Sequence, residues 1–424
     1  MMGYRLLAAC IFQLNERRNN TMKAKKRYSG YKSFDYLDKK DFKQFEIAEE
    51  IGWGNVETYE VPLTEDEEIR VENILDKNLV ISLHDHVISL PKHKNEMITA
   101  IKECRAFTAY EALSKSCLDA VFDNQSMYIF FGAYSRGWKW DDCLYDLGMR
   151  LSDIDHQDFV CVGKGIEDIK KAKNEGNIAL IPAFESCTMI ENELDRLDVL
   201  YGLGVRMLGI TYSDANLLGS GLNEKEDRGL TNFGYKVVER LNKLGIAIDV
   251  AHSGDQTSLD VIEASETPIF ISHAGARSVW NTRRMVPDEV IEKCASKGGV
   301  IGIEAAPHTT PSEEHKEQSI ESFFDHVKYC IELVGVDHVA FGPDTIYGDH
   351  CGLHAALSES LSLGAFKKKN AGEVPEIDFV KGLENPTECS NNVIRYLVKA
   401  GYSDKDAAKI IGGNVIRVLK EVWA

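Results

Sequence analysis

The chain has 424 residues, of which 44% are hydrophobic, and this is enough to bury the core of one elaborated barrel or of two domains. Its formal net charge of −18 disfavours nucleic acid or an anionic membrane as a partner, because those surfaces reward clustered Lys and Arg. The 10 cysteines include no Cys-x-x-Cys pair, so neither a zinc ribbon nor a disulfide framework is indicated. These features predict an acidic globular protein with reduced thiols.

The first residues contain a short apolar run, residues 6–12, which lies between Arg5 and the pair Arg17 and Arg18. The few apolar residues before Cys10 are similar to the start of a signal peptide or lipoprotein anchor, but they are too few for the apolar core of a signal. A cytoplasmic location is therefore expected, with export through such a short signal or anchor as the alternative. No stretch approaches the roughly 20 apolar residues of a membrane span.

The chain divides into two parts by composition. Residues 1–77 are charged and aromatic and are predicted to form an N-terminal extension and a pre-barrel elaboration. Met22 opens a lysine-rich stretch, so residues 1–21 are predicted to contribute nothing to the fold. Residues 78–424 are predicted to form the main domain together with its C-terminal helices.

Short apolar runs recur through this main domain and predict eight strands: 78–83, 126–132, 178–184, 205–210, 246–251, 268–272, 300–303 and 338–341. Near-continuous apolar strands are typical of a parallel sheet that is buried on both faces. Segments 246–251 and 268–272 flank a helical stretch, 256–265, and form the clearest strand, helix, strand unit. With right-handed crossovers, eight such units predict an α/β fold, a (β/α)8 TIM barrel.

Helices are predicted between and after these strands at 97–114, 165–175, 232–244, 256–265, 286–297, 319–334, 403–411 and 414–423. Thr231 is the predicted N-cap of helix 232–244, and Gly245 is its predicted end. Ser403 with Asp406 is similar to a capping box, and helix 414–423 is predicted to pack outside the barrel. Residues 346–383 show no clear period and are predicted to form a long loop over the mouth, after the last strand.

Histidines and carboxylates recur at the predicted strand ends: His84 and His86 after the first strand, Glu185 after the third, His252 after the fifth, His273 after the sixth and Asp344 after the eighth. Each alone has a structural explanation, because a lone histidine is more often a hydrogen-bonded structural residue than a ligand. Polar residues at the carboxyl ends of barrel strands converge at the mouth, however. Imidazoles and carboxylates together match the ligands of zinc or a similar divalent ion, and a bridging carboxylate allows two ions.

Seven segments resemble the membrane dipeptidase (renal dipeptidase) family of metallopeptidases, a branch of the amidohydrolase-like barrels: 203–208, 229–234, 249–253, 272–277, 284–288, 342–344 and 412–414. The likeness covers roughly residues 78–424. The order and spacing of the segments carry it, since no one of them is specific.

The resemblance implies two divalent ions per chain, with zinc the expected metal, held by His84 at the first ion, Glu185 between both, and His252 with His273 at the second. Asp344 would be the catalytic acid and base that handles the proton of a metal-bridging hydroxide. Arg284 would bind the free carboxylate of the substrate, because a guanidinium fork suits a carboxylate. The alternative for Arg284 is a surface arginine beside Arg283.

Four positions depart from the family pattern. His86 stands where the family has aspartate, so the second ligand at the first ion would be an imidazole. Tyr212 stands where the family has a histidine that stabilises the oxyanion, and a phenol can donate a hydrogen bond there without a positive charge. Met285 replaces an asparagine and Ile346 replaces an aspartate. These changes are expected to cluster around the substrate rather than the metals.

The expected function is a metallo-dipeptidase that cleaves dipeptides with a free C-terminal carboxylate. One alternative is an amidohydrolase that acts on another small amide, an N-acyl amino acid or a lactone. A second alternative is a non-catalytic ligand-binding barrel. The expected partners are a small-molecule or dipeptide substrate and a second copy in a homodimer, with no nucleic acid and no membrane span.

Overall fold

The computed structural model describes residues 27–41, 45–47, 58–93, 96–97, 99–100, 106–125, 138–357 and 377–423. None of the helices within these ranges has both the length and the apolar character that a membrane crossing needs.

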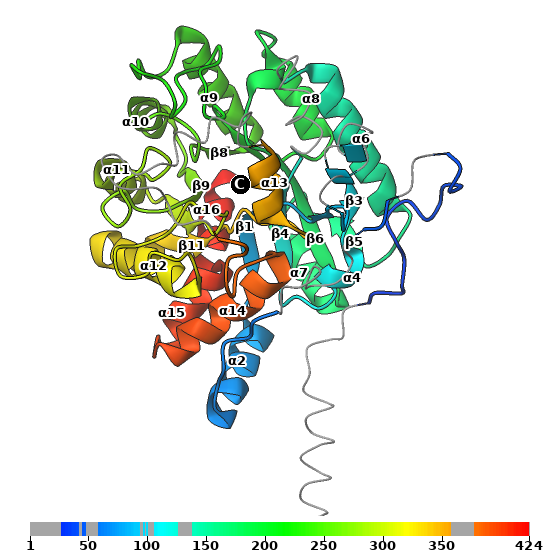
Figure 1. The fold of residues 1–424 in the computed structure, drawn as a ribbon. Helices are drawn as coiled ribbons and strands as arrows, with labels where there is room; N and C mark the ends of the chain where they lie inside the picture. The colour runs from blue at the N-terminus through cyan, green and yellow to red at the C-terminus, as the bar shows by residue number, and fades with distance from the viewer. Residues whose placement is uncertain are drawn as a thin grey trace, which may run out of the picture.

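Eight parallel strands form a nearly closed barrel in their order along the chain (Figure 1): β1 (Ile81–Asp85), β4 (Ala120–Asn124), β6 (Ile178–Phe184), β7 (Met207–Gly209), β8 (Ala247–Asp249), β9 (Phe270–Ala274), β10 (Val300–Ile303) and β11 (Val339–Phe341). An additional strand, β5 (Val160–Val162), pairs with β6. The ring closes just beyond the strand ends. There the Asp344 N–H donates to the His84 carbonyl and the His86 N–H donates to the Thr345 carbonyl, both at 3.0 Å. The predicted (β/α)8 barrel is confirmed.

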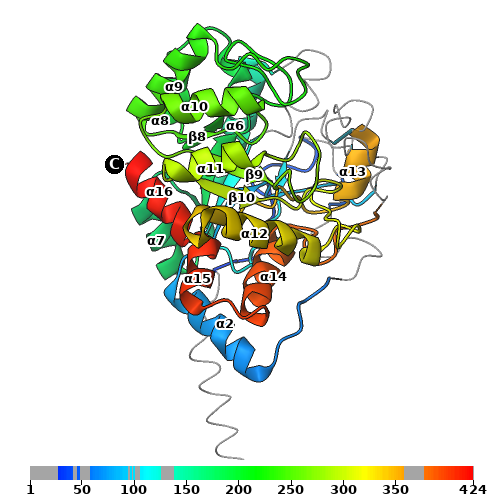
Figure 2. The same ribbon diagram turned by 90° about the vertical axis from the view of Figure 1, so that its left-hand side faces the viewer.

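Helices surround the barrel in both views (Figures 1 and 2): α6 (Trp140–Asp155), α7 (Ile166–Glu175), α8 (Arg196–Gly202), α9 (Asn232–Leu244), α10 (Asp255–Ala264), α11 (Asp288–Ser296) and α12 (Ile320–Val334). The predicted ends of α9 are confirmed. The Thr231 hydroxyl accepts a hydrogen bond from the Gly234 N–H at 3.0 Å, and Gly245 ends the helix with φ of 70°. A left-handed residue at this position favours glycine because it has no Cβ.

The remaining elements lie around this core: α2 (Glu65–Lys77), β2 (Ile88–Ser89), β3 (Phe107–Thr108), α4 (Tyr110–Leu113), η1 (Thr188–Ile190), η2 (Val336–His338), α13 (His350–Leu357), α14 (Pro386–Lys399), α15 (Asp404–Ala408), η4 (Lys409–Gly413) and α16 (Asn414–Val422). Helix α2 is held to α14 by Arg395, which forms ion pairs with Glu68 and Glu60. The Ser403 hydroxyl caps α15 by accepting from the Asp406 N–H at 3.1 Å.

Three predictions about the elements were wrong or incomplete. The second barrel strand is β4 rather than 126–132, which lies outside the described residues. Residues 97–114 are not one helix, because β3 interrupts them and pairs antiparallel with β2. Residues 346–383 are not only loop, since they contain α13, and residues 358–376 lie outside the described residues. For residues 97–114, pairing of β3 with the distant strand β2 outweighed the local helical pattern.

A hydrophobic cluster fills the barrel interior, with residues from every barrel strand and from α16. Phe122 of β4 lies at its centre, with its ring centroid 6.4 Å from that of Phe270 and 6.3 Å from that of Trp423. Helix α16, predicted to pack outside the barrel, contributes Val415, Val418, Leu419 and Val422 to this cluster and so covers the base of the barrel. Figure 2 shows α16 on the side of the barrel opposite α13.

We expect Phe122→Ala to destabilise the protein by about 3–5 kcal/mol, because it removes a fully buried ring and leaves a cavity between the strands and α16. Tyr235→Ala on the exposed side of α9 is the matched control and should change the free energy of unfolding by no more than about 0.5 kcal/mol. Urea unfolding of the two variants measures both values. Equal losses would contradict the placement of Phe122 at the centre of the core.

Candidate metal centre

Six of the predicted site residues lie together at the carboxyl ends of the barrel strands: His84, His86, Glu185, His252, His273 and Asp344. They converge because parallel strands end at the same rim of a barrel. Five of the side chains are at most 8% exposed, and that of Asp344 is 18% exposed. A Cβ at Gly209 would lie 1.9 Å from the Glu185 carbonyl oxygen, so glycine is needed where β7 passes this rim.

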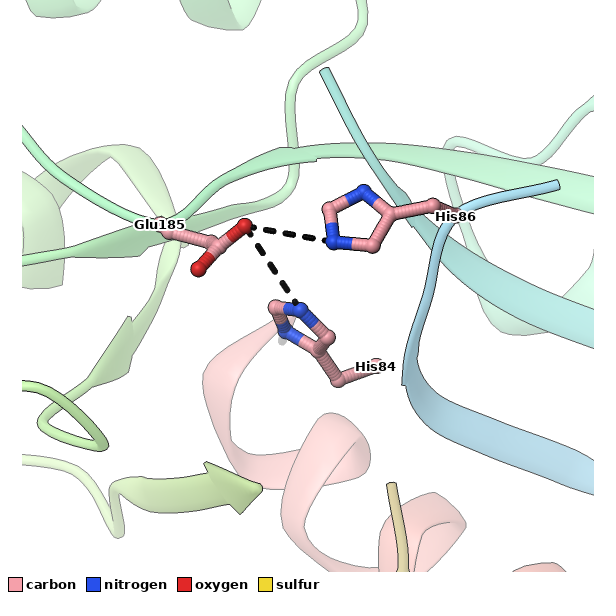
Figure 3. A group of neighbouring side chains, drawn as sticks. All are labelled: His84, His86 and Glu185. Carbon is pink, nitrogen blue, oxygen red and sulfur yellow. Dashed lines mark ion pairs between the residues drawn. The ribbon is translucent and has the colours of Figure 1, made fainter. Parts of the chain in front are cut away.

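The carboxylate of Glu185 lies between two pairs of imidazoles. Its Oε1 is 3.4 Å from His86 Nε2 and 3.7 Å from His84 Nε2 (Figure 3). Its Oε2 is 3.3 Å from His252 Nε2 and 3.9 Å from His273 Nε2. One oxygen therefore faces each pair, which is the arrangement that a carboxylate shared by two cations requires.

Asp344 lies beside the first pair. Its Oδ1 is 3.2 Å from His84 Nε2 and 3.1 Å from His86 Nε2. Its backbone has φ of 56°, a left-handed conformation that aspartate tolerates better than most residues. The bond from its N–H to the His84 carbonyl fixes this turn, so the carboxylate is held over the imidazoles by the closure of the barrel.

Neighbouring polar groups orient the imidazoles. The Ser272 hydroxyl donates to Asp249 Oδ2 at 2.6 Å and lies 2.7 Å from His273 Nδ1. Since the hydroxyl proton is committed to Asp249, the serine oxygen accepts from Nδ1, and the lone pair of His273 Nε2 faces the centre. His86 Nδ1 donates in the same way to the Asn124 carbonyl at 3.2 Å.

The other two histidines also have partners on Nδ1. The Asn124 side-chain amide lies 2.8 Å from His84 Nδ1, and the Ser213 hydroxyl lies 3.2 Å from His252 Nδ1. Each of the four imidazoles is thus held through Nδ1 and turns Nε2 toward Glu185. Holding the far nitrogen is how proteins usually fix the orientation of a metal-binding imidazole.

The protonation states differ between the two pairs of imidazoles. Burial lowers the pKa of His252 and lowers the pKa of His273 well below its usual value, so both imidazoles are neutral at pH 7. Although burial opposes it, the hydrogen bond with Asp344 and the charge of Glu185 raise the pKa of His86 to about 9. Burial likewise opposes ionisation of Glu185 and Asp344, but hydrogen bonds and charge from the histidines lower the pKa of both carboxyls, that of Asp344 well below its usual range.

These residues fit one or more divalent ions. The Nε2 atoms of His252 and His273 are 2.9 Å apart, close enough for a hydrogen bond between the two rings or for both nitrogens to face the same ion. Nε2 of His84 is buried and lies between the carboxylates of Asp344 and Glu185, at 3.2 and 3.7 Å. Three overlapping triads offer nitrogen and oxygen ligand atoms within 4.8 Å of one another: His84, His86 and Glu185; His84, His273 and Asp344; and Glu185, His252 and His273.

Tyr212 lies at the edge of this centre. Its ring packs on that of His252, with the two ring centroids 4.3 Å apart. The ring centroid of Trp138 lies 5.6 Å from that of Tyr212. The structure therefore places Tyr212 next to the second pair of imidazoles.

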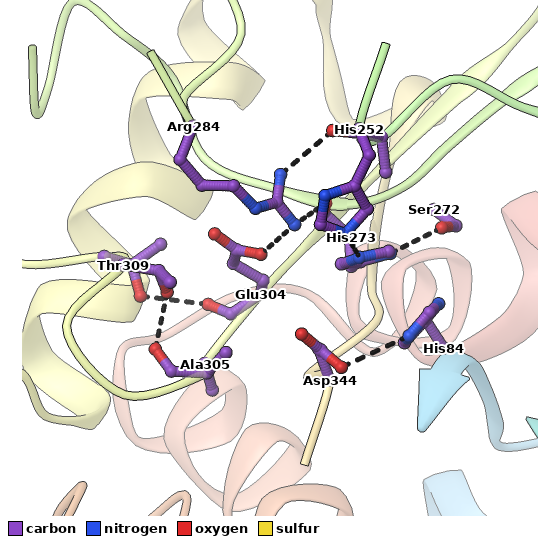
Figure 4. A network of polar contacts seen from close by, with 12 residues as sticks. His84, His252, Ser272, His273, Arg284, Glu304, Ala305, Thr309 and Asp344 are labelled. Carbon is purple, nitrogen blue, oxygen red and sulfur yellow. Dashed lines mark hydrogen bonds and ion pairs between the residues drawn. The ribbon is translucent and has the colours of Figure 1, made fainter. Parts of the chain in front are cut away.

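Arg284 is buried, not at the surface, and it already has partners (Figure 4). Its Nη1 donates to the Ala251 carbonyl at 3.0 Å, and its Nη2 donates to the His273 carbonyl at 2.8 Å and to Glu304 Oε2. Burial raises the pKa of Glu304, but the charge of the adjacent Arg284 guanidinium opposes this rise and favours the ionised carboxylate. The predicted carboxylate-binding arginine thus pairs with a carboxylate of the chain itself.

The other two departures from the family pattern lie in packed regions. Ile346 belongs to a small hydrophobic cluster with Ile88, Leu90, Met97 and Leu353. Met285 is fully buried, and a Cβ at Gly275 would lie 2.6 Å from its sulfur. The contacts of these two residues are with packing neighbours, which differs from the expectation that they face the substrate.

Some residues of the site were not predicted from the sequence: Asn124, Asp249, Ser272 and Glu304. Ser272 directly precedes His273, and Asp249 lies three residues before His252, so adjacency was the available signal. Asn124 and Glu304 each lie at a strand end, as the predicted ligands do.

The barrel and the cluster at its rim define a (β/α)8 protein with a candidate metal centre. The family model for membrane dipeptidase (Peptidase family M19) matches residues 143–356. This match spans half of the chain, and the protein belongs to that family.

Individual relatives agree with this assignment. Dipeptidase tcpJ of Claviceps purpurea (strain 20.1) is 26% identical over 279 residues, which cover 65% of this chain and 58% of that protein. The chain spans about three fifths of the length of the curated relatives it matches.

Solved structures share the fold. An amidohydrolase from Pseudomonas aeruginosa has 22% identity and a TM-score of 0.66, over 83% of this chain and 99% of that one. A metallo peptidase from Rhodobacter sphaeroides, liganded with a phosphinate mimic of the dipeptide L-Ala-D-Ala, has 17% identity and a TM-score of 0.61, over 82% and 99% of the two chains.

We expect Ser272→Ala to weaken metal binding by about 10–100-fold, because His273 would lose the group that fixes its orientation. Competition against a chromogenic chelator measures the affinity. Ser278→Ala removes an exposed hydroxyl a few residues further along and is the control. Equal affinities in the two variants would show that the pair of Asp249 and Ser272 does not hold the ligand.

Proposed function

We propose that this chain is a hydrolase that uses two divalent ions, with zinc the expected metal, to cleave the amide bond of a dipeptide. The observation that carries the proposal is the position of Glu185, with one carboxylate oxygen toward each pair of imidazoles. Membership of the membrane dipeptidase family supports the substrate class. The dipeptide mimic bound by the Rhodobacter relative supports it as well.

Each residue of the centre has a proposed role. His84 and His86 would hold one ion, His252 and His273 the other, and Glu185 would bind both. Bound divalent ions would lower the pKa of a water molecule and polarise the scissile carbonyl.

Asp344 is proposed as the catalytic acid and base. Hydrogen bonds from His84 and His86 overcome the effect of burial and hold its pKa well below the usual range, so it is ionised at pH 7. An ionised carboxylate can accept a proton from the attacking water and pass it to the leaving amine. Asp344 is also the most exposed of the six side chains, which suits a group that must reach the substrate.

Tyr212 is proposed to stabilise the developing negative charge on the carbonyl oxygen. A phenol can donate a hydrogen bond to an oxyanion, although without the positive charge of an imidazolium. Its ring is held against His252, which keeps it next to the second pair of imidazoles.

A second candidate is hydrolysis of another small amide, an N-acyl amino acid or a lactone. The pairing of Arg284 with Glu304 favours those members of this group that lack a carboxylate, such as a simple amide or a lactone, because a free carboxylate would need a donor at this place. A cytoplasmic location and a homodimer stay predictions of the sequence.

Hydrolysis by the zinc-loaded protein tests the proposed function directly. The panel contains L,L and L,D dipeptides, their C-terminal amides, N-acyl amino acids and lactones, each with and without a chelator. Chelator-sensitive cleavage of dipeptides or their amides supports the proposal. Cleavage of lactones or N-acyl amino acids alone would instead support the second candidate, and turnover that survives the chelator would contradict both.

We expect Asp344→Asn to lower turnover by about 10²–10⁴-fold, because the proton carrier is lost while the imidazoles and Glu185 remain. Metal content, measured by atomic emission, should stay near that of the parent. The control is Asp158→Asn, an exposed carboxylate just before β5, at the opposite end of the barrel. Parent-like turnover in Asp344→Asn would remove its assigned role.

A further inference from the structure

The guanidinium of Arg284 has no pair of free N–H groups that could bind a carboxylate through two hydrogen bonds. A carboxylate can bind a guanidinium in two fork geometries, either across Nη1 and Nη2 or across Nε and Nη2, and both use Nη2. The two N–H groups of Nη2 are directed at the His273 carbonyl and at Glu304 Oε2. A substrate carboxylate could form either fork only after one of these partners moves away.

Neither partner is free to leave. The carbonyl of His273 belongs to strand β9, and the N–H of Glu304 donates to the Ala274 carbonyl of the same strand at 3.0 Å. The side chain of Glu304 is fully buried, and Arg284 is only 2% exposed. Separating two buried charges of this kind would leave each of them uncompensated, which is costly in a dry site.

The second oxygen of Glu304 can accept a further hydrogen bond, although the Thr309 hydroxyl also acts on this carboxyl and lowers its pKa. Oε1 is buried and has no hydrogen-bond partner among the described residues. The hydroxyl of Thr309, which lies near this carboxylate, donates to the Ala306 carbonyl at 2.6 Å. The charges of Asp344 and Glu185 act on Glu304, so this oxygen belongs to the same end of the barrel as the metal centre.

From these contacts we infer that Glu304 takes the place of a substrate carboxylate on Arg284. The site would then select substrates whose end at this position is neutral or hydrogen-bond donating, such as a carboxamide. The inference rests on the proposed function for its substrate class and names Glu304 as the residue that sets specificity.

The first test compares matched pairs of dipeptides, one with a free C-terminal carboxylate and one with a carboxamide, on the zinc-loaded protein. The parent should prefer the carboxamide in kcat/KM by about tenfold or more, and Glu304→Gln should remove or reverse this preference. Glu314→Gln, which removes an exposed carboxylate further along the connection from β10 to α12, should retain the parent's preference. A parent that prefers the free carboxylate, or an unchanged ratio in Glu304→Gln, would overturn the inference.

Removal of the Glu304 charge alone can impair folding, because it leaves Arg284 buried and unpaired. A second variant therefore tests the same substrate preference without leaving an unpaired charge. Arg284→Met with Glu304→Met removes both charges at similar volume, a change that buried ion pairs often tolerate. Its preference between the two substrate ends should fall to within about threefold, because neither charge is left to discriminate. A preference equal to that of the parent would overturn the inference.

A test without turnover separates this inference from the proposed function. In Glu304→Ala the guanidinium loses its carboxylate, and acetate can take the vacant place. Sodium acetate should raise the melting temperature of this variant by about 2–4 °C over equal sodium chloride, with no difference for the parent or for Glu314→Ala. No rise in Glu304→Ala would overturn the inference even if the protein hydrolyses dipeptides. A clear rise without any hydrolysis would support it while the proposed function fails.

Discussion

The carboxylate of Glu185, enclosed by four imidazoles that all turn Nε2 toward it, is the interaction on which the rest of the site depends. Each imidazole is held by a hydrogen bond on its far nitrogen, through Ser272, Ser213 or Asn124. Acceptors brought together in a buried site repel one another unless positive charge lies among them. The chain therefore uses its backbone and neighbouring polar groups to hold an arrangement that a divalent ion would stabilise.

The base of the barrel contains the apolar core that stabilises the fold, whereas the mouth contains the polar residues of the candidate metal centre. At the base, α16 and the rings of Phe122, Phe270 and Trp423 form a continuous apolar core. At the mouth, buried carboxylates and imidazoles replace apolar side chains at the strand ends. The closure of the ring links the two functions, because Asp85 accepts from the N–H and the hydroxyl of Thr345 at 3.0 and 2.7 Å, next to Asp344. The same turn that joins β11 to β1 thus positions the proposed proton carrier.

The residues around the candidate metal centre depart from the family pattern more than the residues of the centre do. Arg284 is present where the family pattern predicts it, yet its donors are taken by Glu304 and two backbone carbonyls. Ile346 and Met285 lie in packed clusters. Tyr212 keeps contact with His252 and offers a phenol rather than an imidazole. Residues that bind the metal can preserve the reaction of a family, while neighbouring residues that do not bind the metal change which substrate is accepted.

The sequence by itself determined the barrel, seven of its eight strand positions and the six residues that meet at its mouth. It could do so because an apolar run that ends in a ligand-type residue is a local pattern, and parallel strands carry such ends to one rim. It did not determine the second strand, β4, whose five residues have too weak a local signal, nor β3 within a helical pattern. The tertiary structure also decided that Arg284 is paired, since Glu304 lies 20 residues away in the chain and only the packing of β9 against β10 brings the two charges together. Local patterns fix what an element is, whereas the partner of a long polar side chain depends on which strands become neighbours.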